Sequence, residues 1–447
     1  MPDKNPRSEL SRLLLSLFSA EELRRLIRYL PDGDTLSAEL PGATASAAHL
    51  VDSVGAMLER HGLLSDDLFF ARVREERPRR VGEIDAVAGL FRGASPARAV
   101  RSPASPEPPA RPSSPGRDND NGEGVVRILH LSDFHFGAAT AWDSATCLGR
   151  LAADIRGLRE EVGPPDLVVL SGDIANTGKV EEYAQARAWI EQALMPAAQV
   201  EASQIIPAPG NHDVDRGRTQ SAVARAAQAE LLRSGKQEDV AALLAGEDAD
   251  VLLRRHAAFV QFADAMRLGG VAWQHPWASV RRSIRGLEVH VAAFSSAWLA
   301  ASDQDHGNLL LGLYQANLLL RDAESADLVV SVMHHPWAFF ATWDRPAQIE
   351  VQRISSLVLR GHLHDAGQQL VQGNAHGVVQ ELAAGAAYES SLLPNSYHLL
   401  EARPRAGTLR IRPRFWDVRR REWRADRNLF DAEVHEVPIR RAPAKKA

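Results

Sequence analysis

Carboxylate, imidazole and amide side chains follow short apolar runs at five places in the sequence. The motifs, in chain order, are Asp133-Phe134-His135-Phe136-Gly137, Gly172-Asp173, Gly210-Asn211-His212-Asp213, His334-His335-Pro336 and Gly361-His362-Leu363-His364. Side chains that follow the strands of one sheet converge at the same rim. These donors suit Mn²⁺, Fe²⁺/Fe³⁺ or Zn²⁺, and no thiolate is among them. Each motif alone is a weak signal, but the ordered set predicts a metal centre.

The runs before the motifs predict the elements that must position them. VVRILHL, PDLVVL, QIIPA, LEVHVAAF, DLVVSVM and SSLVLR have the apolar or alternating pattern of strands, and helical stretches separate several of them. Residues 216–268 form an Ala- and Leu-rich helical insert, and residues 365–436 return to strand-like runs. We therefore predict an α/β domain over residues 125–436, followed by a short basic tail over residues 437–447.

The five motifs, in this order, resemble the signature of the calcineurin-like metallophosphoesterases over about residues 126–420. They are similar in detail to those of the class III cyclic nucleotide phosphodiesterases. The resemblance implies a four-layer α/β/β/α sandwich with two central mixed sheets. It also implies two transition-metal ions (Mn, Fe or Zn), with the first held by Asp133, His135 and His364, the second by Asn211, His334 and His362, and both bridged by Asp173. Two such ions about 3.5–4 Å apart activate a shared water, and the bridging hydroxide would attack phosphorus in line.

The resemblance gives His212 a role other than metal binding. At this position the imidazole protonates the leaving oxygen or stabilises the charge that develops there, as a general acid does. Its neighbour Asp213 is expected either to orient that imidazole and fix its tautomer, or to cap the loop. For His335 a packing or supporting role is favoured over substrate contact. His306 is expected in a loop that could edge the substrate cleft.

The stretch after Gly172-Asp173 bears on the substrate. Phosphoprotein phosphatases carry an Asp and an Arg shortly after this motif, whereas here the sequence is Ile174-Ala175-Asn176-Thr177-Gly178. The arginine that would clamp a phosphomonoester dianion is missing from this stretch, although one could come from elsewhere. We therefore favour hydrolysis of phosphodiesters, with cyclic or signalling nucleotides as the leading class. The alternatives are a nuclease of the same superfamily and a catalytically idle binding module. The idle module is disfavoured because the sequence contains every expected ligand and also His212.

The first 92 residues have helical periodicity and no comparable strand signal. Leu10, Leu13, Leu14 and Leu17 recur at helical spacing, Ser19 and Glu22 form a capping box, and Gly62 and Pro78 end later helical runs. The stretches SLFSAEELRRLIRYL, ELPG and HGLLSDDLFFARVREERPRRVGEI resemble bacterial effector-associated domain 1, a small death-domain-like all-α bundle. The resemblance covers about residues 8–92. It implies an adaptor that pairs with a similar domain on another protein of a bacterial conflict or defence system. An unrelated helical bundle is the alternative.

Residues 93–124 predict a flexible linker, because they contain seven prolines and Val100 as their one branched apolar residue. An ordered loop is the alternative. The whole chain has 447 residues, a net charge of −5 and one cysteine, Cys147. These values give no argument for nucleic-acid or membrane binding and exclude an internal disulfide. The sequence shows neither a secretory signal nor an apolar run long enough for a membrane span, so we expect a cytoplasmic protein.

Overall fold

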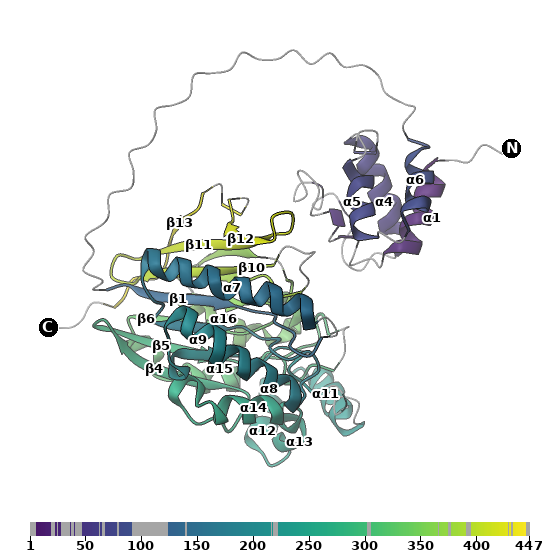
Figure 1. Ribbon diagram of the computed structural model, residues 1–447. Helices are drawn as coiled ribbons and strands as arrows, with labels where there is room; N and C mark the ends of the chain where they lie inside the picture. Colours follow the sequence, from purple (N-terminus) through teal and green to yellow (C-terminus); the bar gives the residue numbers. More distant parts are fainter. Residues whose placement is uncertain are drawn as a thin grey trace. The chain divides into compact units, whose positions relative to one another are not determined.

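The computed structural model describes most of the chain outside the predicted linker (Figure 1). The described residues are 6–18, 23–24, 26–27, 36, 40, 47–61, 63–64, 68–77, 80–91, 124–138, 141–215, 217, 222–301, 305–364, 366–373, 377–389, 395–427, 429–430 and 432–443. The chain divides into two compact units, Met1–Ser114 and Pro115–Ala447. The predicted capping box at Ser19 and Glu22, the helix stops at Gly62 and Pro78, and the linker up to residue 123 lie outside the described residues.

Every regular element in the described part of the first unit is a helix. Among the described residues, these helices include α1 (Pro6–Leu17), α4 (Ala47–Arg60), α5 (Leu68–Glu76) and α6 (Val81–Ala88). Leu14, Val54, Phe69 and Phe70 are fully buried in its apolar core. Burial of one apolar stripe per helix is what the periodicity of the leucines predicts. The resemblance of this unit to an effector-associated domain stays a prediction.

The second unit is a mixed α/β fold with two sheets, as predicted. One sheet has the strand order β12-β11-β10-β1-β2-β3 with β13 paired to β11, and the other has the order β4-β5-β6-β7-β9-β8. The strands are β1 (Val126–Leu131), β2 (Leu167–Leu170), β3 (Ile205–Pro207), β4 (Ala278–Ile284), β5 (Leu287–Ala293), β6 (Leu328–Val332), β7 (Leu357–Arg360), β8 (Gly367–Gly373), β9 (Gly377–Ala383), β10 (Ser396–Arg403), β11 (Thr408–Asp417), β12 (Glu422–Ala425) and β13 (His435–Pro438).

The α-helices of this unit connect and cover the strands. In the part of the unit that the structure describes, they are α7 (Ala141–Val162), α8 (Val180–Trp189), α9 (Met195–Ala198), α11 (Ala222–Ser234), α12 (Gln237–Ala245), α13 (Ala249–Leu253), α14 (Ala257–Ala265), α15 (Leu313–Leu319) and α16 (Arg345–Ile354). Four of them, α11 to α14, fall within the predicted helical insert. No helix in the described ranges is both long enough and apolar enough to cross a membrane.

Parallel pairing places the ends of the motif-bearing strands together. In the first sheet β1, β2 and β3 are parallel neighbours, and in the second sheet β5, β6 and β7 are parallel neighbours. Residues of β2 and β6 are buried along the whole strand, which explains their uninterrupted apolar runs. Along β6 and β7 the side chains alternate between two cores. Val330 and Leu359 share a core with the first sheet, whereas Val329 and Val358 lie in the core that includes α15 and α16.

Candidate metal centre

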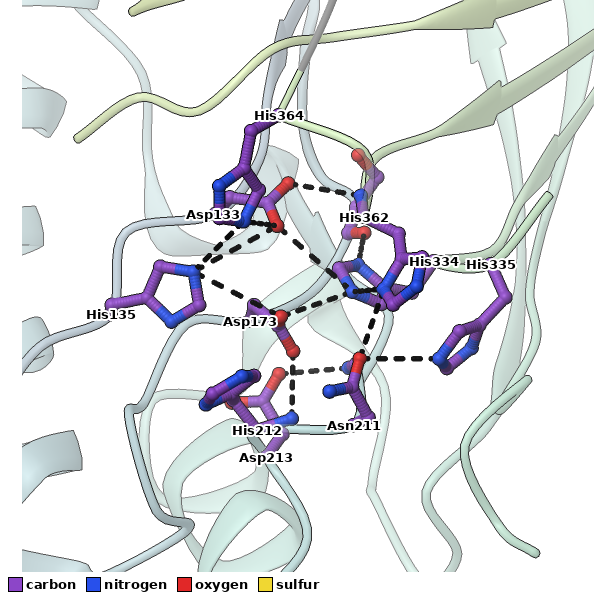
Figure 2. Close-up of polar contacts among 12 residues, drawn as sticks. Asp133, His135, Asp173, Asn211, His212, Asp213, His334, His335, His362 and His364 are labelled. Carbon is purple, nitrogen blue, oxygen red and sulfur yellow. Dashed lines mark hydrogen bonds and ion pairs between the residues drawn. The ribbon is translucent and has the colours of Figure 1, made fainter. Parts of the chain in front are cut away.

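The loops that follow β1, β2, β3, β6 and β7 meet at one place and bring all seven predicted ligands together (Figure 2). Five of these ligands have left-handed backbones, with φ values of 55° at Asp133, 48° at His135, 50° at Asp173, 77° at His362 and 57° at His364. Such conformations are costly for residues with a Cβ and cluster at functional sites. The surrounding loops must therefore hold these residues in place.

Two glycines allow the ligand loops to approach each other. Gly172 has a φ of 106°, and a Cβ there would lie 2.6 Å from Cγ of His334. A Cβ at Gly361 would lie 2.5 Å from Oδ2 of Asp133. Both contacts are shorter than real Cβ atoms tolerate, so a side chain at either position would push a ligand out of place.

Asp133, His135 and His364 form what we call the first subsite. Nε2 of His364 lies 3.2 Å from Oδ1 of Asp133 and 3.3 Å from Nε2 of His135. Potential ligand atoms of these three residues and of Asp173 all lie within 4.8 Å of one another. Oδ1 of Asp133 is buried without a hydrogen-bond partner among the described residues. A buried carboxylate oxygen with no donor, surrounded by imidazole nitrogens, fits a cation.

Asn211, His334 and His362 form the second subsite. Nδ1 of His362 lies 3.3 Å from Nε2 of His334 and 3.1 Å from Oδ1 of Asn211. Oδ2 of Asp173 lies 3.1 Å from Nε2 of His334 and 4.0 Å from Nε2 of His135, so it faces both subsites. This is the position that a bridging ligand needs.

Burial and mutual charge shift the titration of these groups strongly. Burial lowers the pKa of His135 to about 4 and, with help from His334, that of His362 to about 3. Burial also opposes the charged form of His334, but Asp173 and Asp133 outweigh it and raise its pKa to about 9. The carboxyl of Asp173 has a lowered pKa because His334 and other imidazoles outweigh its burial. The centre thus combines ionised carboxylates with neutral imidazoles at His135 and His362, whereas the carboxylates favour the protonated forms of His334 and His364, which would have to release a proton to bind a metal.

His335 lies beside the second subsite, and its hydrogen bonds show a supporting role. The Ser296 hydroxyl accepts from the backbone N–H groups of His334 (3.1 Å) and His335 (3.2 Å), so its own hydrogen points to Nδ1 of His335 at 2.9 Å. Nε2 of His335 then carries the ring proton and donates to Oδ1 of Asn211 at 3.2 Å. Potential ligand atoms of His335, His334 and His362 cluster closely, but both of its ring nitrogens are already engaged. His335 therefore orients the amide of Asn211.

Two further groups orient ligand imidazoles. Nδ1 of His334 donates to the carbonyl of Ser171 at 2.8 Å, and Nδ1 of His364 pairs with Oε2 of Glu389 at 3.0 Å. Such partners fix the ring orientation and raise the basicity of the coordinating nitrogen. Sequence reasoning missed both Ser296 and Glu389, because no motif or spacing marks them.

His212 lies next to the first subsite and outside the ligand set. Its backbone N–H donates to Oδ1 of Asp173 at 2.8 Å, and its Nδ1 donates to the carbonyl of Asn176 at 2.7 Å. Its ring packs edge-on against that of His135, with centroids 4.7 Å apart. A main-chain carbonyl therefore fixes the tautomer that was expected to depend on Asp213.

The carboxylate of Asp213 bonds to the loops that carry the ligands. Its carboxylate accepts hydrogen bonds from the backbone of Gly210 (2.9 Å), Ala175 (2.8 Å) and Ile174 (3.2 Å), and from the Tyr183 hydroxyl (2.8 Å). Burial, with the nearby charge of Asp173, raises its pKa to about 7. Asp213 fixes the loops that carry the ligands, which is the loop-capping alternative.

An aromatic ring covers the side of the second subsite. The half-buried Phe339 packs edge-on against His362 with ring centroids 4.4 Å apart, and the exposed His306 packs against Phe339 with centroids 4.9 Å apart. The loop of His306 therefore reaches the wall of the metal centre.

The family follows from a comparison with known proteins. The model of the calcineurin-like phosphoesterases matches residues 126–366, which is more than half of the chain. The chain belongs to the calcineurin-like phosphoesterase family. This family comprises hydrolases that act on phosphoric esters with divalent metals, and the matched residues include every candidate ligand of both subsites.

Individual relatives of this calcineurin-like phosphoesterase are distant. An 87-residue stretch is 34% identical to a probable cyclic nucleotide phosphodiesterase of Rhodococcus erythropolis, and it covers 19% of this chain and 28% of that protein. A dimetal phosphatase from Danio rerio is 12% identical with a TM-score of 0.39, and the match covers 71% of this chain and 99% of the phosphatase. A phosphopantetheinyl hydrolase from Mycobacterium tuberculosis is 14% identical with a TM-score of 0.31, covering 59% of this chain and 91% of the hydrolase.

Proposed function

We propose that this protein is a two-metal phosphodiesterase that hydrolyses cyclic or related signalling nucleotides. The observation that carries the proposal is the position of Oδ2 of Asp173, which faces both His334 of the second subsite and His135 of the first subsite. Bound metals, of which Mn, Fe and Zn all suit these donors, would supply an activated water and neutralise charge on the phosphoryl oxygens.

The chain's own contribution to the reaction would come from His212. Its backbone is held by Asp173 and its Nδ1 by Asn176, so the ring has one orientation beside the first subsite. The ring can then give a proton to the leaving oxygen or stabilise charge there. Asp133 and Asp173, both buried, would hold the cations in place.

Two observations favour a nucleotide diester. Residues 174–178 carry no arginine, so this loop offers no cationic side chain to clamp a monoester dianion. Its backbone N–H groups at Ile174 and Ala175 already donate to Asp213. Phe339 presents an aromatic ring beside His362, on which a base could stack. The local similarity to a probable cyclic nucleotide phosphodiesterase supports the same substrate class.

One kinetic comparison tests the proposal. Full-length protein loaded with Mn²⁺ should hydrolyse bis-p-nitrophenyl phosphate faster than p-nitrophenyl phosphate, and it should lose both activities on chelation. His212→Ala should keep its metals while losing about 10²–10⁴-fold in rate on diesters with poor leaving groups. A preference for the monoester, or full activity after chelation, would contradict the proposal. Faster cleavage of single-stranded DNA than of cyclic nucleotides would favour the nuclease alternative.

We also propose that the first unit recruits the enzyme to a protein partner with a similar helical domain in a bacterial defence system. The support is the sequence resemblance of residues 8–92 together with the separate apolar core of this unit. A flexible linker over residues 93–124 would have a reach of roughly 30 Å, which tethers the catalytic unit without fixing its orientation.

Truncation tests the recruitment proposal. A chain that begins at Gly124 should keep its metals and most of its activity, because no ligand lies before this residue. Residues 1–92 alone should fold and bind a neighbouring gene product with a similar domain. Loss of metals from the truncated enzyme would show that the first unit belongs to the catalytic core, and failure of residues 1–92 to bind such a product would remove the adaptor role.

A further inference from the structure

The first turn of α8 faces the loop that holds His212, and it carries a carboxylate to which neither the motifs nor the family resemblance gives a role. The side chain of Glu182 is buried, with 8% of the residue exposed. Its Oε2 accepts hydrogen bonds from the backbone N–H groups of Thr177 (2.9 Å) and Lys179 (3.0 Å), and its Oε1 accepts from the Thr177 hydroxyl (2.7 Å). A buried carboxylate thus has three donors, and two of them belong to one residue of the loop.

The bond from Thr177 leads directly to His212. The N–H of Thr177 and the carbonyl of Asn176 belong to the same planar peptide unit. That carbonyl accepts the hydrogen bond from Nδ1 of His212 at 2.7 Å. Glu182 and His212 therefore bond to opposite edges of one peptide unit. An ionised acceptor on the N–H polarises the peptide and strengthens its carbonyl as an acceptor.

Glu182 is itself fixed from a second direction. Its side chain fills the space at Gly137, where φ is 96° and a Cβ would lie 2.5 Å from Cγ of Glu182. Gly137 follows the ligand His135 by two residues. On the far side of the loop, Lys179 pairs with Asp215 at 2.6 Å and so ties the start of α8 to the segment that follows His212. Displacement of the 176–177 peptide would have to break several of these contacts at once.

We propose that Glu182 is the orienting carboxylate of His212 and that it acts through the peptide between Asn176 and Thr177. It takes the role that the sequence suggested for Asp213. Glu182 is a positioning residue, since it holds the Nδ1–H tautomer and the ring orientation from a distance. The consequence for catalysis rests on the proposed function of His212 at the leaving oxygen.

A matched pair of variants in the full-length, metal-loaded protein tests the proposal. Glu182→Gln keeps the size of the side chain but removes its charge, so the N–H of Thr177 then donates to a neutral amide oxygen, which polarises the peptide less. Glu181→Gln makes the same change at the exposed neighbouring position. We expect Glu182→Gln to lower kcat on diphenyl phosphate by about 10- to 100-fold, the usual effect of removing a group that orients an imidazole, and to lower it less on bis-p-nitrophenyl phosphate. Glu181→Gln should leave both rates unchanged, and neither variant should lose metal.

A double-mutant cycle separates positioning from general damage. In a His212→Ala background, Glu182→Gln should cause no further loss, because the residue through which it acts is gone. Equal losses on both esters, loss of metal, or losses that multiply with that of His212→Ala would overturn the proposal. If Glu182→Gln does not fold, Thr177→Val removes only the hydroxyl bond to Oε1 and should show a smaller loss with the same dependence on the leaving group. A loss in Thr177→Val that is equal on both esters would overturn it as well.

Proton NMR of the Zn²⁺-loaded protein decides the proposal independently of activity. The Nδ1 proton of His212, assigned by its disappearance in His212→Ala, should be protected from exchange in the wild-type protein and in Glu181→Gln. It should exchange faster in Glu182→Gln than in the wild-type protein, because the Asn176 carbonyl becomes a weaker acceptor. If the wild-type protein hydrolyses neither ester, or if His212→Ala is fully active, the proposed function fails while this signal still reports on the orientation of His212. An unchanged signal in Glu182→Gln would overturn the role of Glu182.

Discussion

The two metal subsites differ in how firmly their ligands are held. In the second subsite, His334 is fully buried, and Asn211 is oriented by His335, which is 1% exposed and is itself held by Ser296. In the first subsite, the side chains of His135 and His364 are 11% and 24% exposed. The partner of His364 is Glu389, which is 25% exposed, and Nδ1 of His135 has no hydrogen-bond partner among the described residues.

This difference predicts unequal metal affinities. A rigid set of donors loses less freedom when an ion binds, so the second subsite should hold its ion more tightly. The more exposed first subsite, with fewer orienting contacts, should exchange its ion more readily. Variants that act on one subsite, on both, or on neither can test this expectation.

The largest effect is expected from Asp173→Asn, which should weaken metal binding at both subsites. The carboxylate faces both of them, and an amide of the same size lacks its charge. We expect weaker binding of both ions. We also expect a loss of activity greater than the roughly 10- to 100-fold that is typical when a hydrogen-bond partner of a metal ligand is removed. Metal content by mass spectrometry and diesterase rates check this. An effect on one ion alone would show that Asp173 does not bridge.

Ser296→Ala should weaken the second subsite selectively. The variant loses the hydroxyl that fixes the tautomer of His335, and through it the amide of Asn211. Affinity for the more tightly held ion should fall about 10- to 100-fold, as measured by metal titration. Ser295→Ala is the matched control, because that buried neighbouring hydroxyl has no hydrogen-bond partner among the described residues. Equal effects of the two variants would contradict the role of His335.

Phe339→Ala should separate substrate binding at the second subsite from metal binding there. Loss of a stacking ring should raise KM for cyclic nucleotides about tenfold. A diester without a base, such as glycerophosphoethanolamine, should show no such change, and metal content should stay the same. A loss shared by both substrates would mean that the ring only supports His362.

The smallest effect is expected at the exposed partner of the first subsite. Glu389→Gln should lower affinity for the weaker ion by less than about tenfold, because a solvent-accessible pair contributes little. Metal titration at low and high salt checks this, and the difference from the wild-type protein should shrink as salt rises. A large effect on the tighter ion would reverse the assignment of the two subsites.

The sequence predicted that the seven candidate ligands converge, because each lies just beyond the end of a strand whose apolar run is visible. The seven positions converge as expected, and the helical insert lies within the expected range. The order of strands in the sheets could not be predicted, because β1 pairs with β10, more than 260 residues later, through contacts that no local sequence pattern encodes. Whether the first unit is an adaptor also stays a prediction.

The orienting groups were missed for a different reason. Adjacency left two roles open for Asp213, orienting His212 or capping the loop, and the backbone turn directs its carboxylate to Gly210 and Ala175. Ser296 and Glu389 reach their histidines from distant parts of the chain, where a lone serine or glutamate carries no signal. Tautomers and buried hydrogen bonds depend on tertiary contacts, so they required the structure.

Calorimetric titration of Mn²⁺ into the metal-free full-length chain, repeated with Zn²⁺, tests the central claim most directly. We predict two ions per chain in two steps of different affinity, with Ser296→Ala weakening the tighter step and Asp173→Asn weakening both. Binding of a single ion, or of none, by the wild-type protein would contradict a two-metal phosphoesterase centre.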